Sequence, residues 1–282
     1  MVLIGSSDES RTRFLSTTLQ ALSVIRDSTC PVDIEAIAQL LNAKIDYSDL
    51  LYDGSVEETD DNGYVICVNM NQSHAKQRFT IAHEIGHILL NEEKKKAPSD
   101  KGTWKEGPEI LSETGYSSNN PIERHCNRIA ASILIPEESA RKLSDWTRIT
   151  VSGVEAEAQK WQMSLTALLW RVLALSDRIG GFAWLSKKTD ALDGRQEMSV
   201  DSVVFPKLFE RRGKIRYPIV IPKKHSSVPS HSKLLEASGE ETLIRGIIFA
   251  TGSNQKWTVR IKEISEKDNE SKYLAIIYPL GF

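Results

Sequence analysis

The amino-acid sequence predicts an α+β protein of 282 residues, with helices and short strands first, an all-helical middle, and a small mixed α/β part at the end. Three observations lead to this prediction. Apolar residues recur at helical spacing over much of the first 178 residues. Two runs rich in β-formers, 44–50 and 64–70, interrupt that pattern. After Gly180-Gly181 the pattern changes to strands, so this glycine pair is the clearest linker signal.

The first ninety residues are expected to form helices around a short sheet. Pro31 opens the second helix, since proline suits a helix start. The expected elements, in chain order, are helices at 10–27 and 32–42, strands at 44–50 and 64–70 separated by an acidic turn at 57–63, and a helix at 73–90.

The remaining residues divide at a long loop and at the glycine pair. Residues 91–120 contain several glycines and prolines, and a loop of about thirty residues is unusual in a compact domain. A helix then runs from Ile122 to Ile135, where Pro136 ends it. Helices are expected near 137–143, 153–161 and 164–176, and strands at 182–185, 217–221, 243–250, 257–264 and 273–278. We therefore predict three domains: 1–136, 137–179 and 180–282.

Composition limits the classes of partner. With 36 basic and 38 acidic residues the formal charge is −2, which gives no overall attraction to nucleic acid or a membrane. The three cysteines are odd in number and widely spaced, as expected in a reducing compartment. The start has no basic segment before an apolar run, and no apolar stretch reaches membrane-spanning length. A cytoplasmic location without membrane partners is expected.

The segment His83-Glu84-Ile-Gly-His87 is the most informative motif, an HExxH pattern. Residues four apart on a helix project from one face, so His83 and His87 can share one tetrahedral Zn²⁺. Glu84 is offset by about 100° around the axis, within reach of a metal-bound water without being a ligand. Zinc lowers the pKa of such a water towards ~7, and Glu84 can act as its general base.

The same five-residue pattern also arises by chance in a helix with two surface or core histidines. The flanking residues favour the metal instead, because they make this helix largely buried. Buried histidines and a buried glutamate need polar partners, and a metal ion supplies one. The flanking apolar residues are Ile81, Ala82, Ile85, Ile88, Leu89 and Leu90.

A third protein ligand is expected from the helix at 122–135, which offers Glu123 and His125. Glu123 shares a stripe of small and apolar residues with Cys126 and Asn127, the face that can pack against another helix. His125 is rotated by about 200° from Glu123, onto the outer side. Helical phase therefore favours Glu123, with Asn127 one turn later as its second-shell partner. A solvated carboxylate at a helix start is the alternative reading of Glu123.

These two blocks resemble the ImmA/IrrE family of cytoplasmic zinc metallopeptidases. The resemblance rests on the segments Gln77–Leu90 and Ile122–Pro136, together with an upstream Pro-Val-Asp-Ile-Glu helix, and covers roughly residues 1–140. It implies a zincin-like fold, with His83, His87 and Glu123 as zinc ligands and Glu84 as the catalytic carboxylate. The commonest family form has Glu-Ala-Asn where this chain has His125-Cys126-Asn127.

The resemblance also implies a function. Family members typically cleave a helix-turn-helix transcriptional repressor and so relieve repression under stress. The chain is accordingly expected to be a metalloprotease, a hydrolase of narrow specificity that acts in transcription regulation and stress response. The alternative is a zinc-containing regulator that binds a protein or nucleic acid without cleaving it. The residue that assists the oxyanion stays open among Tyr116, His125 and His74.

The later parts of the chain give weaker functional signals. Residues 153–175 resemble a helix-turn-helix unit, as in IrrE-like chains, in which a sensory-like domain follows. Arg171 is the only charged residue of its second helix, which favours a core or interface helix over DNA reading. A basic run at 207–224 is either a solvated face or a partner-binding site for an acidic peptide or nucleic acid. Its candidate residues are Lys207, Arg211, Arg212, Lys214 and Arg216.

Overall fold

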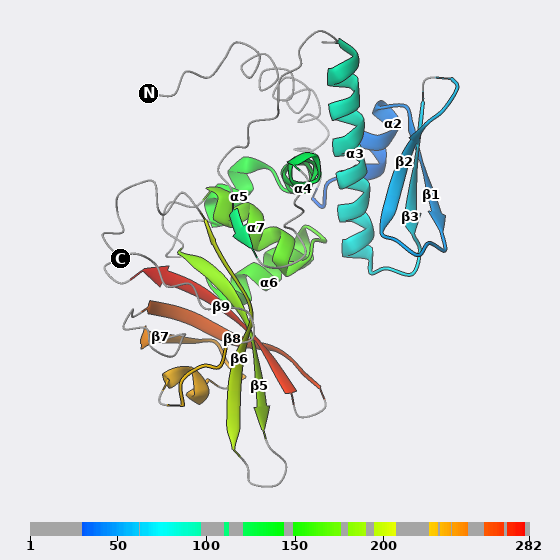
Figure 1. The fold of residues 1–282 in the computed structure, drawn as a ribbon. Coiled ribbons are helices and arrows are strands. Elements are labelled where there is room, and N and C mark those ends of the chain that lie inside the picture. Colours follow the sequence, from blue (N-terminus) through cyan, green and yellow to red (C-terminus); the bar gives the residue numbers. More distant parts are fainter. Residues whose placement is uncertain are drawn as a thin grey trace. The chain divides into compact units, whose positions relative to one another are not determined.

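The protein is an α+β structure, as predicted, and is described here from a computed structural model (Figure 1). The described residues are 30–61, 63–96, 110–112, 121–143, 149–175, 180–189, 195–206, 226–230, 232–237, 239–247, 257–267 and 270–279. The helix expected at 10–27, the strand at 217–221 and the basic run at 207–224 lie outside them.

The chain forms two compact units. The first comprises residues 1–107, 118–140 and 157–171, and the second comprises 108–117, 141–156 and 172–282. The three-domain division drawn from the sequence stays a prediction. Among the described residues, no helix is long and apolar enough to cross a membrane.

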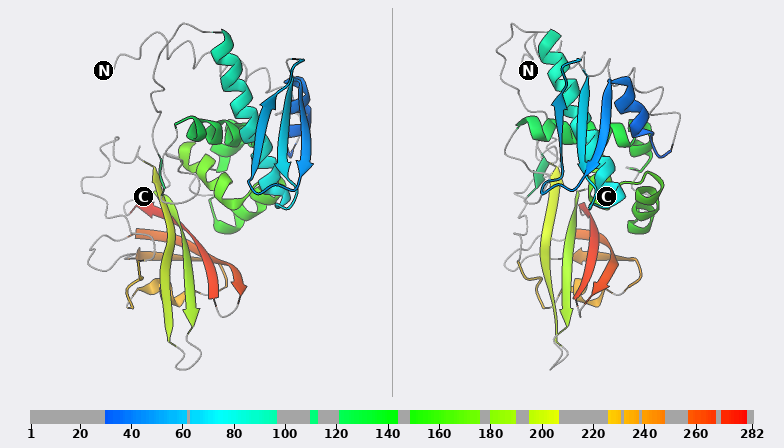
Figure 2. Two further views of the ribbon diagram at one scale, coloured as in Figure 1. Left: turned by 45° about the vertical axis from the view of Figure 1, so that its right-hand side comes forward. Right: turned by 90° about the vertical axis from the view of Figure 1, so that its right-hand side faces the viewer.

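A three-stranded sheet forms one layer of the first unit. Its strands are β1 (Ala43–Ser48), β2 (Gly54–Glu58) and β3 (Tyr64–Asn69), in the order β1-β3-β2, with β1 parallel and β2 antiparallel to β3. Alternate residues of β3 are buried, which gives the sheet one apolar face. The helices α2 (Ile34–Leu40) and α3 (His74–Lys96) lie against this sheet (Figure 2).

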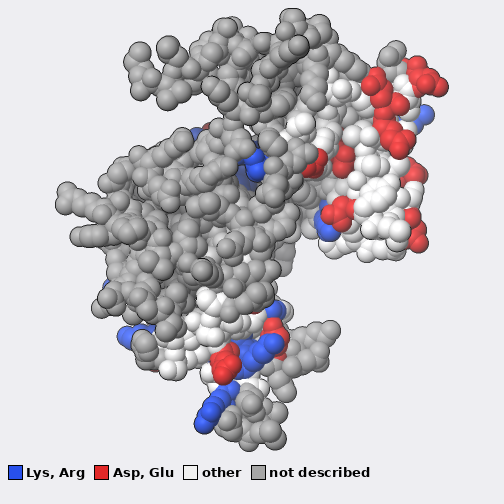
Figure 3. Space-filling view, viewed as in Figure 1, with Lys and Arg blue, Asp and Glu red and all other residues white. Residues whose placement is uncertain are grey.

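The acidic turn expected at 57–63 is partly wrong, because its first two residues, Glu57 and Glu58, belong to strand β2. Its sequence, Gly-Ser-Val-Glu-Glu, is poor in β-formers, so local propensity gave no strand signal. Pairing with β3, for example of Val56 with Ile66, forms the strand instead. The turn itself is shorter, and it is closed by a 2.9 Å hydrogen bond from the Thr59 amide to the Gly63 carbonyl. Acidic side chains gather on this part of the surface (Figure 3).

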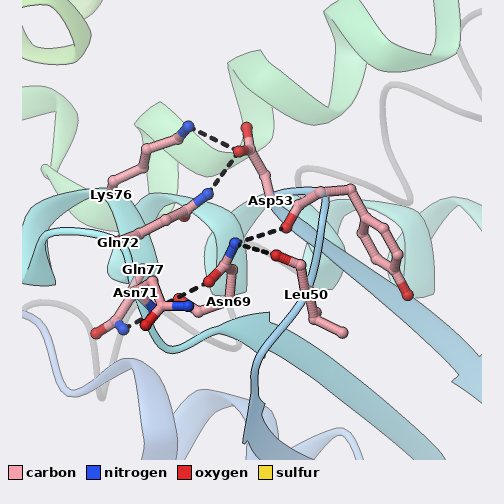
Figure 4. A network of polar contacts seen from close by, with 8 residues as sticks. Leu50, Asp53, Asn69, Asn71, Gln72, Lys76 and Gln77 are labelled. Atoms are coloured by element: carbon pink, nitrogen blue, oxygen red, sulfur yellow. Dashed lines mark hydrogen bonds and ion pairs between the residues drawn. The ribbon is translucent and has the colours of Figure 1, made fainter.

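A polar network around Asn69 fixes the start of α3 to the sheet (Figure 4). The Asn69 amide nitrogen donates to the carbonyl oxygens of Leu50 at 2.7 Å and Tyr52 at 3.1 Å. Gln77, in the first turn of α3, donates to the Asn69 carbonyl at 3.2 Å. The side chain of Asn69 therefore holds the loop between β1 and β2, and its main-chain carbonyl holds the first turn of α3.

The remaining helices follow the sequence prediction closely. They are α4 (Pro121–Leu134), α5 (Glu137–Leu143), α6 (Val151–Lys160) and α7 (Leu165–Leu175). Gln162 adopts a positive φ of 50° at the turn between α6 and α7. The Ser164 hydroxyl then accepts a hydrogen bond from the Ala167 amide at 3.2 Å and so caps the start of α7.

A six-stranded sheet dominates the second unit. Its strands are β4 (Ile110–Ser112), β5 (Gly181–Thr189), β6 (Gln196–Pro206), β7 (Thr242–Ile247), β8 (Trp257–Lys267) and β9 (Glu270–Pro279), in the order β4-β6-β5-β9-β8-β7. Every neighbouring pair is antiparallel. One face carries a buried apolar cluster to which Leu234 of the 3₁₀ helix η1 (Lys233–Glu236) also belongs. Strands β4 and β6 were not predicted, and β4 falls within the loop expected at 91–120.

Polar contacts join the start of α6 to this sheet. The two Glu241 carboxylate oxygens accept hydrogen bonds from the Val151 and Ser152 amides, each at 3.0 Å. The Tyr278 hydroxyl donates to the Ile149 carbonyl at 2.8 Å. Burial raises the pKa of Tyr278 above its ordinary value, so this hydroxyl keeps its proton. The amino end of α6 is therefore a fixed part of the second unit.

Candidate metal centre

His83 and His87 lie one turn apart on α3 and face each other. Their Nε2 atoms are 3.2 Å apart, and their side chains are 16% and 26% exposed. The apolar residues around them are buried, as predicted. Two imidazole nitrogens at this separation suit one shared cation better than two unrelated surface histidines.

Glu123, in the first turn of α4, reaches both histidines. Its Oε2 lies 3.0 Å from Nε2 of His83, and its Oε1 lies 3.4 Å from Nε2 of His87. Ligands held 2.0–2.1 Å from a tetrahedral zinc ion are about 3.3 Å from one another. The spacing of the three residues' donors, 3.0 to 3.4 Å, therefore fits a zinc ion.

Asn127 holds His83 from the other side of the ring. Its Oδ1 lies 2.9 Å from Nδ1 of His83, while Nε2 of the same ring faces Glu123. A ligating histidine usually donates its second ring N–H to such an acceptor, which fixes both the tautomer and the ring orientation. This contact leaves Nε2 of His83 as the atom available for a metal.

Glu84 is buried beside this cluster, with 7% of its surface exposed. Burial raises its pKa from an ordinary value of 4.5 to about 7, and the negative charge of Glu123 adds to the rise. A carboxyl group with a pKa near 7 can both accept and return a proton at neutral pH.

Gly86 and Cys126 mark a close approach of α3 and α4. A Cβ atom added to Gly86 would lie 3.1 Å from Cα and 3.2 Å from Cβ of Cys126. The glycine inside the HExxH motif therefore permits the contact that brings α4 against the histidine pair.

Cys126 is a candidate ligand that the sequence analysis did not single out. Its Sγ lies within 4.8 Å of one ring nitrogen of each of His83 and His87, and those two nitrogens lie within the same distance of each other. The residue is fully buried. Its position on the stripe that carries Glu123 was the signal that the sequence contained.

The other candidates from the sequence lie elsewhere or outside the described residues. His74 is the exposed first residue of α3. His125 is half-buried, and burial lowers its pKa, with the charge of Arg128 adding to the effect. Tyr116 and the basic residues Lys207, Arg211, Arg212, Lys214 and Arg216 lie outside the described part of the chain.

The fold and the histidine-rich cluster define a metallopeptidase-like domain in an α+β chain. Residues 41–172 match the family model of a peptidase family described as the IrrE N-terminal-like domain. Residues 41–172 of this chain therefore form an IrrE N-terminal-like domain, in agreement with the resemblance to the ImmA/IrrE family seen in the sequence.

Comparison with solved structures adds a likeness of fold. A chain described as a Mycobacterium tuberculosis transcriptional regulator is similar over 98% of this chain and 94% of that chain, with a TM-score of 0.51 and 10% identity. A comparison with curated proteins gives no match.

Proposed function

We propose that this protein is a zinc-dependent endopeptidase of narrow specificity, which cleaves a helix-turn-helix transcriptional repressor. The observation that carries the proposal is the spacing of the donors of His83, His87 and Glu123, 3.0 to 3.4 Å apart on two packed helices. These three residues would hold the zinc ion, with Asn127 orienting His83.

The chemistry divides between the metal and the chain. When bound, zinc would act as a Lewis acid towards the scissile carbonyl and lower the pKa of water. Glu84 would take the proton of the attacking water and pass it to the leaving amine. Its burial beside the proposed ligands His83 and Glu123 supports this role.

The proposed substrate follows from the family and from the structural neighbour. ImmA/IrrE resemblance implies cleavage of a repressor, and the neighbour is described as a transcriptional regulator. The function would be to relieve repression under stress. One cognate repressor would suffice as the substrate, so the proposed peptidase has narrow specificity.

The metal is tested by elemental analysis of the purified full chain. We expect one zinc ion per chain in the wild type and its loss in His87→Ala. His74→Ala is the matched control, because His74 is exposed at the start of the same helix. Equal zinc contents in wild type and His87→Ala would contradict the proposed site.

Cleavage is tested by co-expression with the helix-turn-helix protein encoded nearest to this chain. Wild type should shorten that protein, and Glu84→Gln should leave it intact while retaining zinc. Glu35→Gln, which changes an exposed carboxylate on α2, should cleave like wild type. An intact repressor in a stable complex with wild-type protein would favour the non-proteolytic regulator instead.

A further inference from the structure

Cys126 lies on α4 where this helix contacts α3, and its sulfur atom lies beside the histidine pair. Its Sγ is within 4.8 Å of one ring nitrogen of each of His83 and His87. Tetrahedral zinc holds a thiolate sulfur at ~2.3 Å and an imidazole nitrogen at ~2.0–2.1 Å, so the two are ~3.6 Å apart. Sulfur and nitrogen would then need to approach by at most roughly 1.2 Å, within the range of a side-chain rotation.

The backbone around Cys126 is held in place from both sides. Gly86 allows its Cα and Cβ to lie against α3, one residue before His87. Glu123 and Asn127 on the same helix already contact His83, at 3.0 and 2.9 Å. The thiol is therefore carried on the helix that also supplies the proposed carboxylate ligand and the histidine's hydrogen-bond partner.

We propose that Cys126 is a fourth protein ligand of the zinc ion, in addition to His83, His87 and Glu123; this rests on the proposed zinc site. Cys126 binds as the thiolate, and its proton passes to solvent, because metal ligands must be deprotonated. The resting site then has two nitrogen donors, one oxygen donor and one sulfur donor.

A fourth protein donor changes what the site does. Structural zinc sites are closed by four protein ligands, whereas catalytic sites keep one position open. With zinc bound, four protein ligands would leave no open position, so the binding of a substrate would have to displace the Cys126 thiolate before cleavage. A buried cysteine that merely fills space at the contact with Gly86 is the competing explanation, and it leaves no sulfur on the zinc.

Zinc X-ray absorption of the full chain, loaded with one equivalent of Zn²⁺, separates these explanations. We expect one sulfur scatterer at ~2.3 Å in the wild type, absent in Cys126→Ser and in Cys126→Ala. Cys67→Ser is the matched control, because Cys67 lies on β3 and should leave the sulfur signal unchanged. Zinc affinity should fall by about tenfold or more in Cys126→Ala, since even second-shell changes cost ~10–100-fold.

A second readout uses Co²⁺ in place of zinc. The wild type and Cys67→Ser should show a near-ultraviolet thiolate-to-cobalt charge-transfer band, and Cys126→Ala should lack it while keeping its folded circular dichroism spectrum. Stoichiometric zinc with nitrogen and oxygen donors alone would overturn the role of Cys126 and leave the proposed peptidase intact. Failure of the wild type to bind zinc at all would overturn both proposals.

Discussion

Asn127 and His83 contact each other across the α3–α4 interface, with Oδ1 of Asn127 2.9 Å from Nδ1 of His83. The contact fixes the plane of the imidazole ring, so that its Nε2 faces Glu123 at 3.0 Å. The orientation of His83, a proposed metal ligand, therefore depends on Asn127, which contacts the ring nitrogen that does not face the metal site.

Replacing Asn127 by alanine should weaken zinc binding without abolishing it. Loss of the hydrogen bond frees the ring of His83, and such outer contacts are worth ~10–100-fold in metal affinity. Competition with a chelator measures the change. Ser132→Ala is the control, because the Ser132 hydroxyl donates to a backbone carbonyl of its own helix, that of Arg128, at 2.8 Å. Equal affinities of Asn127→Ala and wild type would show that His83 needs no such support.

Replacing Gly86 by alanine should move α4 away from α3. The new Cβ would meet Cys126 atoms at 3.1 and 3.2 Å, and overpacking of this kind costs ~1–3 kcal/mol. Alanine's better helix propensity returns about 1 kcal/mol, so zinc affinity should fall more clearly than stability does. Chelator competition and urea unfolding measure the two effects.

Gly239→Ala is the control for that substitution, because a Cβ at Gly239 would meet no atom within 4 Å. It should change neither zinc affinity nor stability appreciably. Zinc binding by Gly86→Ala as tight as that of the wild type would mean that the two helices can separate without moving Glu123 from the histidines.

Glu84 should make the metal-free protein less stable as the pH rises. Its pKa is 4.5 ordinarily and about 7 in the folded chain, because burial and the charge of Glu123 disfavour ionisation. The unfolded chain therefore loses this proton first, and stability falls between about pH 4.5 and pH 7. Glu84→Gln lacks the penalty, so above pH 7 it should be more stable than wild type by up to about 3 kcal/mol.

Urea unfolding of the metal-free chains across this pH range measures the difference. It should vanish below pH 4.5, where the wild-type carboxyl is protonated in both states. Glu35→Gln should follow the wild-type profile, because Glu35 is exposed on α2. Parallel profiles for wild type and Glu84→Gln would mean that the folded chain hydrates the Glu84 carboxylate.

The helices that carry the site were predictable because their apolar residues repeat at helical spacing. The expected helices at 73–90 and 122–135 correspond to α3 and α4, and helical phase on α4 predicted that Glu123 rather than His125 would face the histidines. The contacts of Glu123 agree with that phase argument, and its role as a ligand stays a prediction.

The strands were harder to predict where pairing, and not local sequence, forms them. β2 carries two glutamates and a glycine, and β4 lies in a segment of glycines and prolines. Cys126 was placed on the packing stripe, but the distance to the histidines depends on how closely two helices approach at Gly86. Such an approach is a tertiary property, which one helix's periodicity does not contain.

Replacing Glu241 by alanine should destabilise the second unit through the amino end of α6. The carboxylate accepts from the Val151 and Ser152 amides at 3.0 Å each, and its side chain is only 14% exposed. A carboxylate there accepts from two helix amides that have no partner within the helix, and its negative charge interacts favourably with the positive end of the helix dipole. Its removal should therefore cost ~1–3 kcal/mol. Glu241→Gln should cost less, because one acceptor oxygen remains.

Glu240→Ala is the matched control for the Glu241 cap, since Glu240 is the exposed neighbour in sequence. Thermal unfolding of the full chain is followed by fluorescence and circular dichroism. The transition temperature should be lower for Glu241→Ala than for wild type, and it should be unchanged for Glu240→Ala. If both variants unfold with the wild type, solvent satisfies the α6 amides as well as Glu241 does. In that case, α6 is held to the sheet by its other contacts, the 2.8 Å hydrogen bond from Tyr278 to the Ile149 carbonyl and the ion pair between Lys262 and Glu155.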